Sequence, residues 1–281
     1  MTVGSPVSLS GVGLHTGAAS TVRLFPAAGS TGIRFRLSSG VEIPARADRV
    51  VDTSRCTVLG DPASGERIGT VEHLLSACVG LGVDDLLVEV TAGELPIGDG
   101  SARPWADLLS EGGVAGSLER PRRRICLDRE VIVTGTDGAF IAAYPAESLT
   151  ITVAISFPHP LVGTQVARFS PTSADAYREE IAGARTFGFI EEVDALRAAG
   201  LARGGTLDNA IVIYPDRFST PLRFENELAR HKLLDLMGDL ALGGSTNLPN
   251  ADIIAVKPSH RLNVQLAGQL RDLHAGQSNE D

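Results

Sequence analysis

The residues best suited to chemistry lie on one predicted helix, residues 224–242 (FENELARHKLLDLMGDLAL), which has no proline and consists mainly of good helix formers. At 100° per residue, His231, Asp235 and Asp239 cluster within one quadrant of this helix. An imidazole and a carboxylate four residues apart can hold one divalent cation, but an ordinary solvated polar face has the same pattern. The opposite face is predicted to pack into the core; it carries Ala229, Leu233, Leu236 and Leu240.

Apolar neighbours favour the metal site over the solvated face. Phe224, Leu228 and Leu242 fall in the same quadrant as the histidine and the two aspartates. This face is therefore predicted to be covered, and covered polar groups need partners. Because two protein ligands are too few for a catalytic metal, the hypothesis requires a third ligand and a base from elsewhere in the chain.

Glu72 and His73 could supply both groups. They lie in the first turn of another predicted helix, where a lone histidine is more often structural. Together with His231 and Asp235, His73 would form a three-ligand site whose fourth position is open to water. A catalytic zinc lowers the pKa of bound water to about 7, so Glu72 could take a proton from that water near neutral pH. The spacing is not the HExxH pattern, so these four residues are only moderately specific.

The elements that must position these residues form two similar blocks. In the first block, apolar residues alternate over 22–24 and 33–37 and predict antiparallel strands with one solvent-facing side. A helix is predicted over 70–80 with Thr70 as its N-cap, followed by a strand at 86–90 and a second helix around 105–109.

The second block repeats strands, a helix, a strand and a helix. Its predicted elements are a hairpin closing on Asp137-Gly138, a strand at 149–157, helices at 173–184 and 191–199, a strand at 210–213, the helix at 224–242, a strand at 252–256 and a helix at 262–273. This repetition predicts an α+β fold with two similar domains, 1–119 and 120–281, each a sheet layered with helices. The second domain is predicted to carry a strand and helix insert, and the basic run at 120–124 is interpreted as a linker rather than a phosphate-binding patch.

Composition excludes several functional classes. The net charge of −9 in 281 residues argues against a nucleic-acid partner. The longest apolar run, 74–90, is interrupted by Asp84 and Asp85, and the N-terminal segment has no signal-peptide pattern, so no transmembrane segment is predicted. Three cysteines without CxxC spacing are interpreted as reduced thiols, neither disulfides nor metal ligands. We therefore expect a cytoplasmic protein and a monomer.

Six motifs, in this order, resemble one enzyme family: TVEHLLSA, LPIGDGSA, ARTFGF, GGTLDNAIVI, LRFENELARHKLLDLMGDL and SHRLN. The similarity extends from GVGLHTG at Gly11 through the last predicted helix. The chain is similar to the UDP-3-O-acyl-N-acetylglucosamine deacetylases, the zinc amidases of lipid A synthesis. The resemblance implies a duplicated strand-and-helix fold, bound Zn²⁺, and removal of the N-acetyl group of UDP-3-O-acyl-N-acetylglucosamine to give UDP-3-O-acyl-glucosamine and acetate, the committed step of that synthesis.

The resemblance also implies roles for individual residues. The metal ligands of the family correspond to His73, His231 and Asp235, and the general base corresponds to Glu72. His260 matches the protonated histidine that donates to the leaving amine, and Asp239 matches the carboxylate that keeps that histidine charged. A partner of this kind is needed because the unperturbed histidine pKa is about 6.5.

Substrate contacts follow from the same resemblance. Thr186 matches the hydroxyl that helps to bind the oxyanion, and its alternative role is a threonine at a helix end. Phe187 and Gly188 would face the nucleotide, and Lys232 would reach the diphosphate. Segment 190–212 would line the passage for the 3-O-acyl chain, although by pattern alone its leucines are more often core. Its candidate walls are Leu196, Leu201, Leu207 and Ile211.

Three other histidines receive no catalytic role. His15, in GLHTG, is expected near the cleft but not as a ligand, and His159 and His274 match no family function. The sequence departs from the family at Ser259, where glycine is usual, with Pro258 before it, and in a longer loop at 243–252. These differences affect the expected turnover rate and leave the predicted metal site unchanged.

Two other functions remain compatible with the sequence. A zinc amidase could act on a different N-acylated sugar nucleotide, in which case an unacylated substrate would be turned over better than the 3-O-acylated one. A catalytically silent binding protein could instead use the cleft to hold a nucleotide sugar or an acyl chain. The presence of a base, an acid and three ligands argues against the binding protein.

Overall fold

A computed structural model describes residues 1–115 and 127–277 of the chain. The first half contains β1 (Thr2–Val3), β2 (Val7–Val12), β3 (Ala19–Pro26), β4 (Ile33–Leu37), β5 (Glu42–Pro44), β6 (Val50–Asp52), β7 (Val58–Gly60), β8 (Arg67–Ile68), α1 (Glu72–Leu81), β9 (Leu86–Val90), α2 (Arg103–Glu111) and β10 (Val114–Ala115). Five of these strands form one sheet in the order β2-β3-β9-β4-β5. Within it, β4 and β9 run parallel, and the other neighbouring strands are antiparallel.

The second half repeats this arrangement. It contains β11 (Val131–Thr134), β12 (Phe140–Pro145), β13 (Thr150–Ser156), β14 (Thr164–Phe169), α3 (Ala174–Tyr177), β15 (Phe187–Phe189), α4 (Ile190–Ala198), β16 (Ile211–Ile213), α5 (Glu227–Leu240), β17 (Ala251–Val256) and α6 (His260–Gln277). Its five-stranded sheet has the order β11-β12-β17-β13-β14, with β13 and β17 as the parallel pair. In both sheets, therefore, the last strand in sequence occupies the centre and has a helix on each side of it in the chain.

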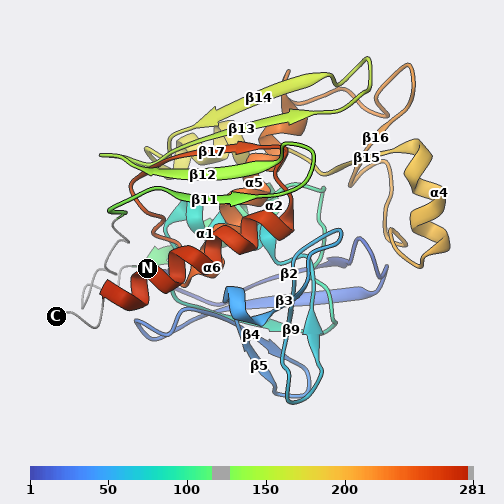
Figure 1. Cartoon of the computed structure of the whole chain (residues 1–281). Coiled ribbons are helices and arrows are strands. Elements are labelled where there is room, and N and C mark those ends of the chain that lie inside the picture. Colours follow the sequence, from blue (N-terminus) through green and yellow to red (C-terminus); the bar gives the residue numbers. More distant parts are fainter. Residues whose placement is uncertain (116–126, 278–281) are drawn as a thin grey trace.

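Helices α1, α2, α5 and α6 lie between the two sheets (Figure 1). α1 packs against α2 and α5, and α5 also packs against α6. The predicted α+β fold of two similar halves is confirmed. The boundary between the predicted domains falls at 119–120, outside the described residues, as do the interpreted linker at 120–124 and Cys126, so the division into domains 1–119 and 120–281 stays a prediction.

Alternating burial explains why the strands form. In β4, Ile33, Phe35 and Leu37 are buried, whereas the alternate residues Arg34 and Arg36 lie on the outer face. There the guanidinium of Arg36 is ion-paired with carboxylates from the neighbouring strands, on β5 and β9. The apolar side of each sheet thus packs against the helices, as the period-two pattern predicts.

The predicted ends of α1 were wrong. Thr70 does not cap the helix, because Val71 is the N-cap residue and makes no side-chain cap. Instead Thr70 has φ +57° and its hydroxyl donates to Glu94. At the other end the helix continues through Leu81, because Gly82 provides the left-handed conformation, φ +70°, that ends it.

The other helix boundaries also differ from the predictions. The helix expected at 173–184 is a single α-helical turn, α3, followed by a π-helical turn over Arg178–Ala182. The helix expected at 224–242 is α5 followed by a 3₁₀ turn at Ala241–Gly243. α6 begins at His260 rather than at residue 262, and the hydroxyl of Ser259 accepts a hydrogen bond from the Leu262 amide at 3.4 Å. Ser259 thus offers a side-chain cap at the start of α6, which the usual glycine lacks.

The predicted insert lies at one edge of the molecule. β15 and β16 pair in parallel, and α4 lies beside them, away from the two main sheets (Figure 1). Among the described residues, no helix combines the length and the apolar character needed to cross a bilayer.

Candidate active site

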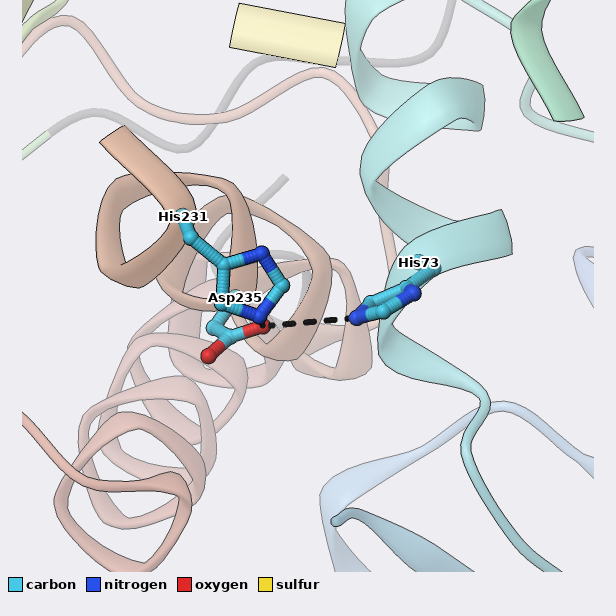
Figure 2. A group of neighbouring side chains, drawn as sticks. All are labelled: His73, His231 and Asp235. Atoms are coloured by element: carbon cyan, nitrogen blue, oxygen red, sulfur yellow. Dashed lines mark ion pairs between the residues drawn. The ribbon is translucent and has the colours of Figure 1, made fainter. Parts of the chain in front are cut away.

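Three predicted metal ligands converge from the two halves. His73 lies near the start of α1, and His231 and Asp235 lie one turn apart on α5 (Figure 2). One ligand atom from each residue lies within 4.8 Å of the others. Asp235 Oδ1 is 3.7 Å from His73 Nε2 and 3.4 Å from His231 Nε2. The structure therefore brings together the three side chains that the sequence predicted as ligands.

The protonation states suit a cation. Burial is the main cause that lowers the pKa of His73, to about 3, and burial also lowers the pKa of His231. Both imidazoles are therefore neutral and can offer a lone pair. Burial alone would raise the pKa of Asp235, but the positive charge of His231, in its protonated form at acid pH, and that of the Lys232 ammonium hold this pKa well below its usual range, so the carboxylate is ionised.

Neighbouring groups orient these ligands. His231 Nδ1 lies 3.1 Å from the carbonyl oxygen of Ala184, and a donated hydrogen bond there leaves Nε2 free to face the cluster. The ammonium of Lys232 donates to Asp235 Oδ2 at 2.9 Å, so Oδ1 is the oxygen that faces both histidines. Two neutral imidazole nitrogens and one carboxylate oxygen form a typical catalytic donor set for a divalent cation.

A glycine makes the convergence possible. Gly238 lies inside α5, where the helix meets the start of α1. A Cβ added to this residue would lie 2.0 Å from the carbonyl oxygen of Glu72, so only glycine allows the two backbones this close approach. Gly238 was not predicted from the sequence, although a glycine inside a strong helical pattern is a signal for close packing.

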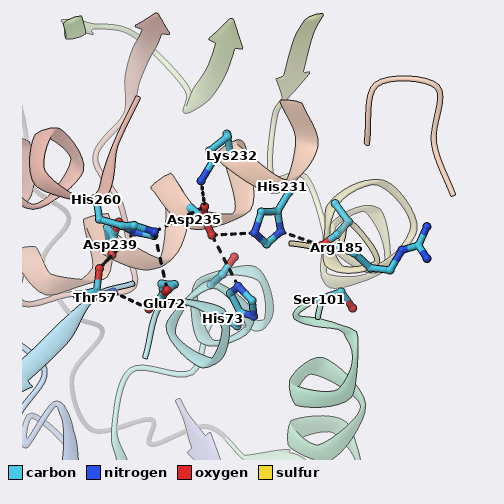
Figure 3. Close-up of polar contacts among 12 residues, drawn as sticks. Thr57, Glu72, His73, Ser101, Arg185, His231, Lys232, Asp235, Asp239 and His260 are labelled. Atoms are coloured by element: carbon cyan, nitrogen blue, oxygen red, sulfur yellow. Dashed lines mark hydrogen bonds and ion pairs between the residues drawn. The ribbon is translucent and has the colours of Figure 1, made fainter. Parts of the chain in front are cut away.

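Glu72 lies beside the ligands on the first residue of α1 and is buried. Burial raises the pKa of its carboxyl group to about 8, although the nearby His260 opposes this shift. Its Oε1 is 3.9 Å from His260 Nε2 (Figure 3). The predicted base and the predicted acid thus face each other across one small space.

His260 is held by a buried carboxylate. Its Nδ1 is 2.9 Å from Asp239 Oδ2, and Asp239 is completely buried. Burial by itself would lower the pKa of His260, but Asp239 outweighs it and the pKa rises to about 9. The imidazole is therefore protonated at neutral pH.

Two further residues bind Asp239 and were missed by the sequence analysis. The Thr57 hydroxyl donates to Asp239 Oδ1 at 2.5 Å, and Asn263 Nδ2 donates to Asp239 Oδ2 at 2.9 Å. Asn263 ends the SHRLN motif and lies one turn after His260, which was a usable signal. Thr57 lies 182 residues before Asp239, and no pattern in the sequence connects them.

Glu94 ties the GLHTG segment to the start of α1. Its buried carboxylate accepts hydrogen bonds from the amides of His15 and Thr16 and from the hydroxyls of Thr16 and Thr70. His15 lines the cavity that contains the ligands, but it does not belong to the metal-binding cluster. The sequence analysis gave Glu94 no role, although it lies directly before the LPIGDGSA motif.

The predicted substrate-binding residues line one cavity of about 460 Å³ together with the cluster. Thr186 is fixed through its backbone, because its amide donates to Gly100 at 2.8 Å and its carbonyl accepts from Ile211 at 2.9 Å. The Phe187 ring lies 6.3 Å from the His231 ring and 5.6 Å from the Lys232 ammonium. Gly188 also lines the cavity, and a Cβ added there would meet no atom within 4 Å.

A buried ion pair fixes the segment that carries Thr186. Arg185 Nε donates to Glu227 Oε1 at 2.8 Å, and Glu227 is the first residue of α5. The backbone amides of Arg185 and Arg223 donate to the same carboxylate. The predicted oxyanion-binding residue is thereby linked to the helix that carries two of the predicted ligands.

The insert contributes the apolar wall of the cavity. Three of the four predicted wall residues, Leu196, Leu207 and Ile211, line it, whereas Leu201 does not. The same cavity is therefore polar at the cluster and apolar along the insert.

Comparison with known proteins identifies the family of this chain. The family model for UDP-3-O-acyl N-acetylglycosamine deacetylase matches residues 1–272. The chain belongs to this family. Among its relatives, UDP-3-O-acyl-N-acetylglucosamine deacetylase of Thermosynechococcus vestitus (strain NIES-2133 / IAM M-273 / BP-1) is 42% identical, over 95% of this chain and 92% of the relative. The proteins of the same name from Anaeromyxobacter sp. (strain Fw109-5) and Synechocystis sp. (strain ATCC 27184 / PCC 6803 / Kazusa) are 44% and 38% identical, over 94% and 97% of this chain and 86% and 99% of the relatives. The predicted family membership is confirmed.

Proposed function

We propose that this protein is a Zn²⁺-dependent amidohydrolase that removes the N-acetyl group of UDP-3-O-acyl-N-acetylglucosamine in lipid A synthesis. The products are UDP-3-O-acyl-glucosamine and acetate. The names of the relatives support this substrate. The observation that carries the proposal is the convergence of three ligand atoms within 4.8 Å beside a carboxylate and a charged histidine.

His73, His231 and Asp235 would hold the cation. Their donor atoms suit Zn²⁺, and they leave room for a fourth ligand as catalytic zinc sites do, although iron would suit the same ligands nearly as well. When bound, the cation would supply Lewis acidity and lower the pKa of water in the site.

Glu72 and His260 would carry the protons. A cation held beside Glu72 would lower the pKa of its carboxyl group from the raised value that burial causes, and the resulting carboxylate would take a proton from the attacking water as the oxygen of that water bonds to the acetamide carbonyl carbon. Thr186 would donate its hydroxyl to the oxygen that becomes negative, and one such donor contributes about 3 kcal/mol in other enzymes. His260 Nε2 would then give its proton to the departing nitrogen as the carbon–nitrogen bond breaks, and Asp239 keeps that imidazole charged before transfer.

The cavity supports a substrate with a charged end and an apolar chain. Lys232 lies beside the cluster, where its ammonium would reach a diphosphate, and Phe187 and Gly188, which line the same cavity, would face the nucleotide. Leu196, Leu207 and Ile211 offer apolar contacts for the 3-O-acyl chain. We further propose a cytoplasmic monomer, in keeping with the free thiols of Cys56 and Cys78.

Metal analysis combined with a deacetylation assay tests the proposal. Protein purified without chelator should contain about one divalent metal per chain and should release acetate from the 3-O-acylated substrate. Chelation should abolish this activity and added Zn²⁺ should restore it. Better turnover of the unacylated sugar nucleotide would favour an amidase of different substrate, and absence of both metal and turnover would favour a binding protein.

A further inference from the structure

Thr57 touches both proton-transferring groups from a position outside every motif. It directly precedes β7 and is completely buried. Its hydroxyl donates to Asp239 of the second half and lies 3.4 Å from His260 Nδ1, and its backbone amide donates to Glu72 of the first half (Figure 3). Thr57 thus lies at the junction between the two halves, next to the predicted base and the partner of the predicted acid.

The hydroxyl of Thr57 fixes the Asp239 carboxylate. It donates to Oδ1 at 2.5 Å, whereas His260 Nδ1 and Asn263 Nδ2 approach Oδ2, each at 2.9 Å. With a donor on each oxygen, the carboxylate is held against rotation and presents Oδ2 to His260. The opposite ring nitrogen, Nε2, then faces the cluster, 3.9 Å from Glu72 Oε1.

The backbone of Thr57 fixes the Glu72 carboxylate in the same way. The Thr57 amide donates to Glu72 Oε2 at 3.1 Å, which leaves Oε1 directed toward the reaction site. One residue therefore sets the direction of both groups, and it does so through two different atoms. Because a side-chain substitution removes the hydroxyl but not the amide, the two contacts can be separated by experiment.

We propose that Thr57 is a positioning residue of the deacetylation reaction, whose hydroxyl aligns the Asp239–His260 pair with Glu72. The inference rests on the proposed function, because it assigns Thr57 to the same proton transfers. Thr57 does not touch substrate, and it acts through the residues that do. Outer partners of this kind typically change activity by about 10- to 100-fold when removed.

Substitution by valine tests the hydroxyl alone. Thr57→Val keeps the volume and the backbone amide, and it should lower kcat by about 10- to 100-fold with KM within about threefold of wild type. Thr57→Ser restores the hydroxyl and should recover most of kcat. A purely structural role would instead lower the amount of folded, metal-loaded protein and leave kcat per folded molecule unchanged, so metal content and Tm are measured on every variant.

A matched control and a second variant guard against a folding defect. Thr150 is also buried and hydrogen-bonded, to Ser170, but it lies on β13 outside the cavity, so Thr150→Val should leave kcat and KM unchanged. Thr57→Ala removes the hydroxyl together with the γ-methyl group, puts nothing in their place, and should give the same loss in kcat. If both hydroxyl-free variants fail to fold while Thr57→Ser folds, Thr57 is structural and the inference is overturned.

A double-mutant cycle identifies the partner through which Thr57 acts. In an Asp239→Ala background, Thr57→Val should lower kcat by less than about twofold further, because the carboxylate that the hydroxyl orients is gone and its remaining approach to His260 Nδ1, 3.4 Å, is long for a hydrogen bond. If the fold-loss in kcat of the double variant equals the product of the fold-losses of the two single variants, the two residues act independently and the inference is overturned. The proposed function fails if the wild-type protein does not release acetate, whereas an active wild type together with a fully active Thr57→Val refutes only the role of Thr57.

Discussion

Helices α1 and α5 occupy equivalent places in the two halves, before the central strand of each sheet, and they pack against each other. They serve the site differently. α1 contributes only its first two residues, Glu72 and His73, and the rest of it is largely buried core. α5 contributes a complete polar face over three successive turns, with His231, Asp235 and Asp239.

The helices that follow the central strands differ as well. α6 begins with His260, which points into the site, whereas α2 begins with Arg103, whose guanidinium donates to the carbonyl of Arg178. In the part of the chain that the structure describes, the two similar halves therefore share one asymmetric site. α5 is thus organised around the ligands and the partner of the acid, whereas α1 is organised around the core and supplies a ligand and the base at its first turn. The following experiments test this division.

The largest effect is expected when α5 loses a ligand. His231→Ala should release the metal and reduce deacetylation to background, because the two remaining ligands are too few for tight binding. Metal analysis and an acetate-release assay measure both quantities. His159→Ala, at a histidine outside the cluster, should keep its metal. Full metal content in His231→Ala would show that His231 is not a ligand of the cation.

Removal of the base from α1 should separate binding from catalysis. Glu72→Gln should keep the metal and lose about 10³-fold in kcat, because general-base catalysis contributes about 10²- to 10⁴-fold. The amide cannot accept a proton but preserves the side-chain shape. If this variant retains wild-type turnover, α1 supplies a ligand but no base.

The contact between the two helices can be broken at Gly238. Gly238→Ala places a Cβ 2.0 Å from the Glu72 carbonyl oxygen and should destabilise the fold by about 1–3 kcal/mol through overpacking, with a loss of activity. Gly268→Ala in α6 is the matched control, since its Cβ would lie 3.9 Å from Ala47, and it should be neutral or stabilising by up to about 1 kcal/mol. Chemical denaturation measures the free energy of unfolding of both variants. Equal stability of the two variants would contradict the close approach.

The pH dependence reports on the acid that α5 and α6 build together. Because protonated His260 is required and Asp239 raises its pKa to about 9 against the effect of burial, activity should fall as the pH rises through about 9. Asp239→Asn removes the negative charge, which lowers the pKa of His260, so the alkaline fall should move to lower pH. Measurement of kcat as a function of pH for the wild type and for Asp239→Asn tests this prediction. An unchanged alkaline limb would assign it to another group.

The smallest effect is expected in the insert. Leu207 lines the cavity and is 54% exposed, so Leu207→Ser should weaken binding of the acyl chain by up to about 1 kcal/mol, which raises KM about two- to fivefold for the 3-O-acylated substrate. The KM of an unacylated substrate should not change. A similar rise for both substrates would place Leu207 outside the acyl passage.

Much of the fold follows from local patterns. The alternation in strands such as β4 and β9 and the helical period of α5 are set by neighbouring residues, so the sequence predicted them correctly. The start of α1 was mispredicted because Thr70 gives its hydroxyl to Glu94, a residue 24 positions away, rather than to the helix. Competition from a distant partner cannot be recognised from local propensity.

Local geometry fixes which side chains share a face, because one helix turn places His231 and Asp235 together whatever surrounds them. The motifs are also local, and through them the family, and with it His73 and His260, could be predicted. How these faces meet is a property of the folded chain. The fit of Gly238 against Glu72 and the reach of Thr57 to Asp239 join residues 166 and 182 positions apart, and such contacts depend on how two halves pack rather than on any spacing along the chain.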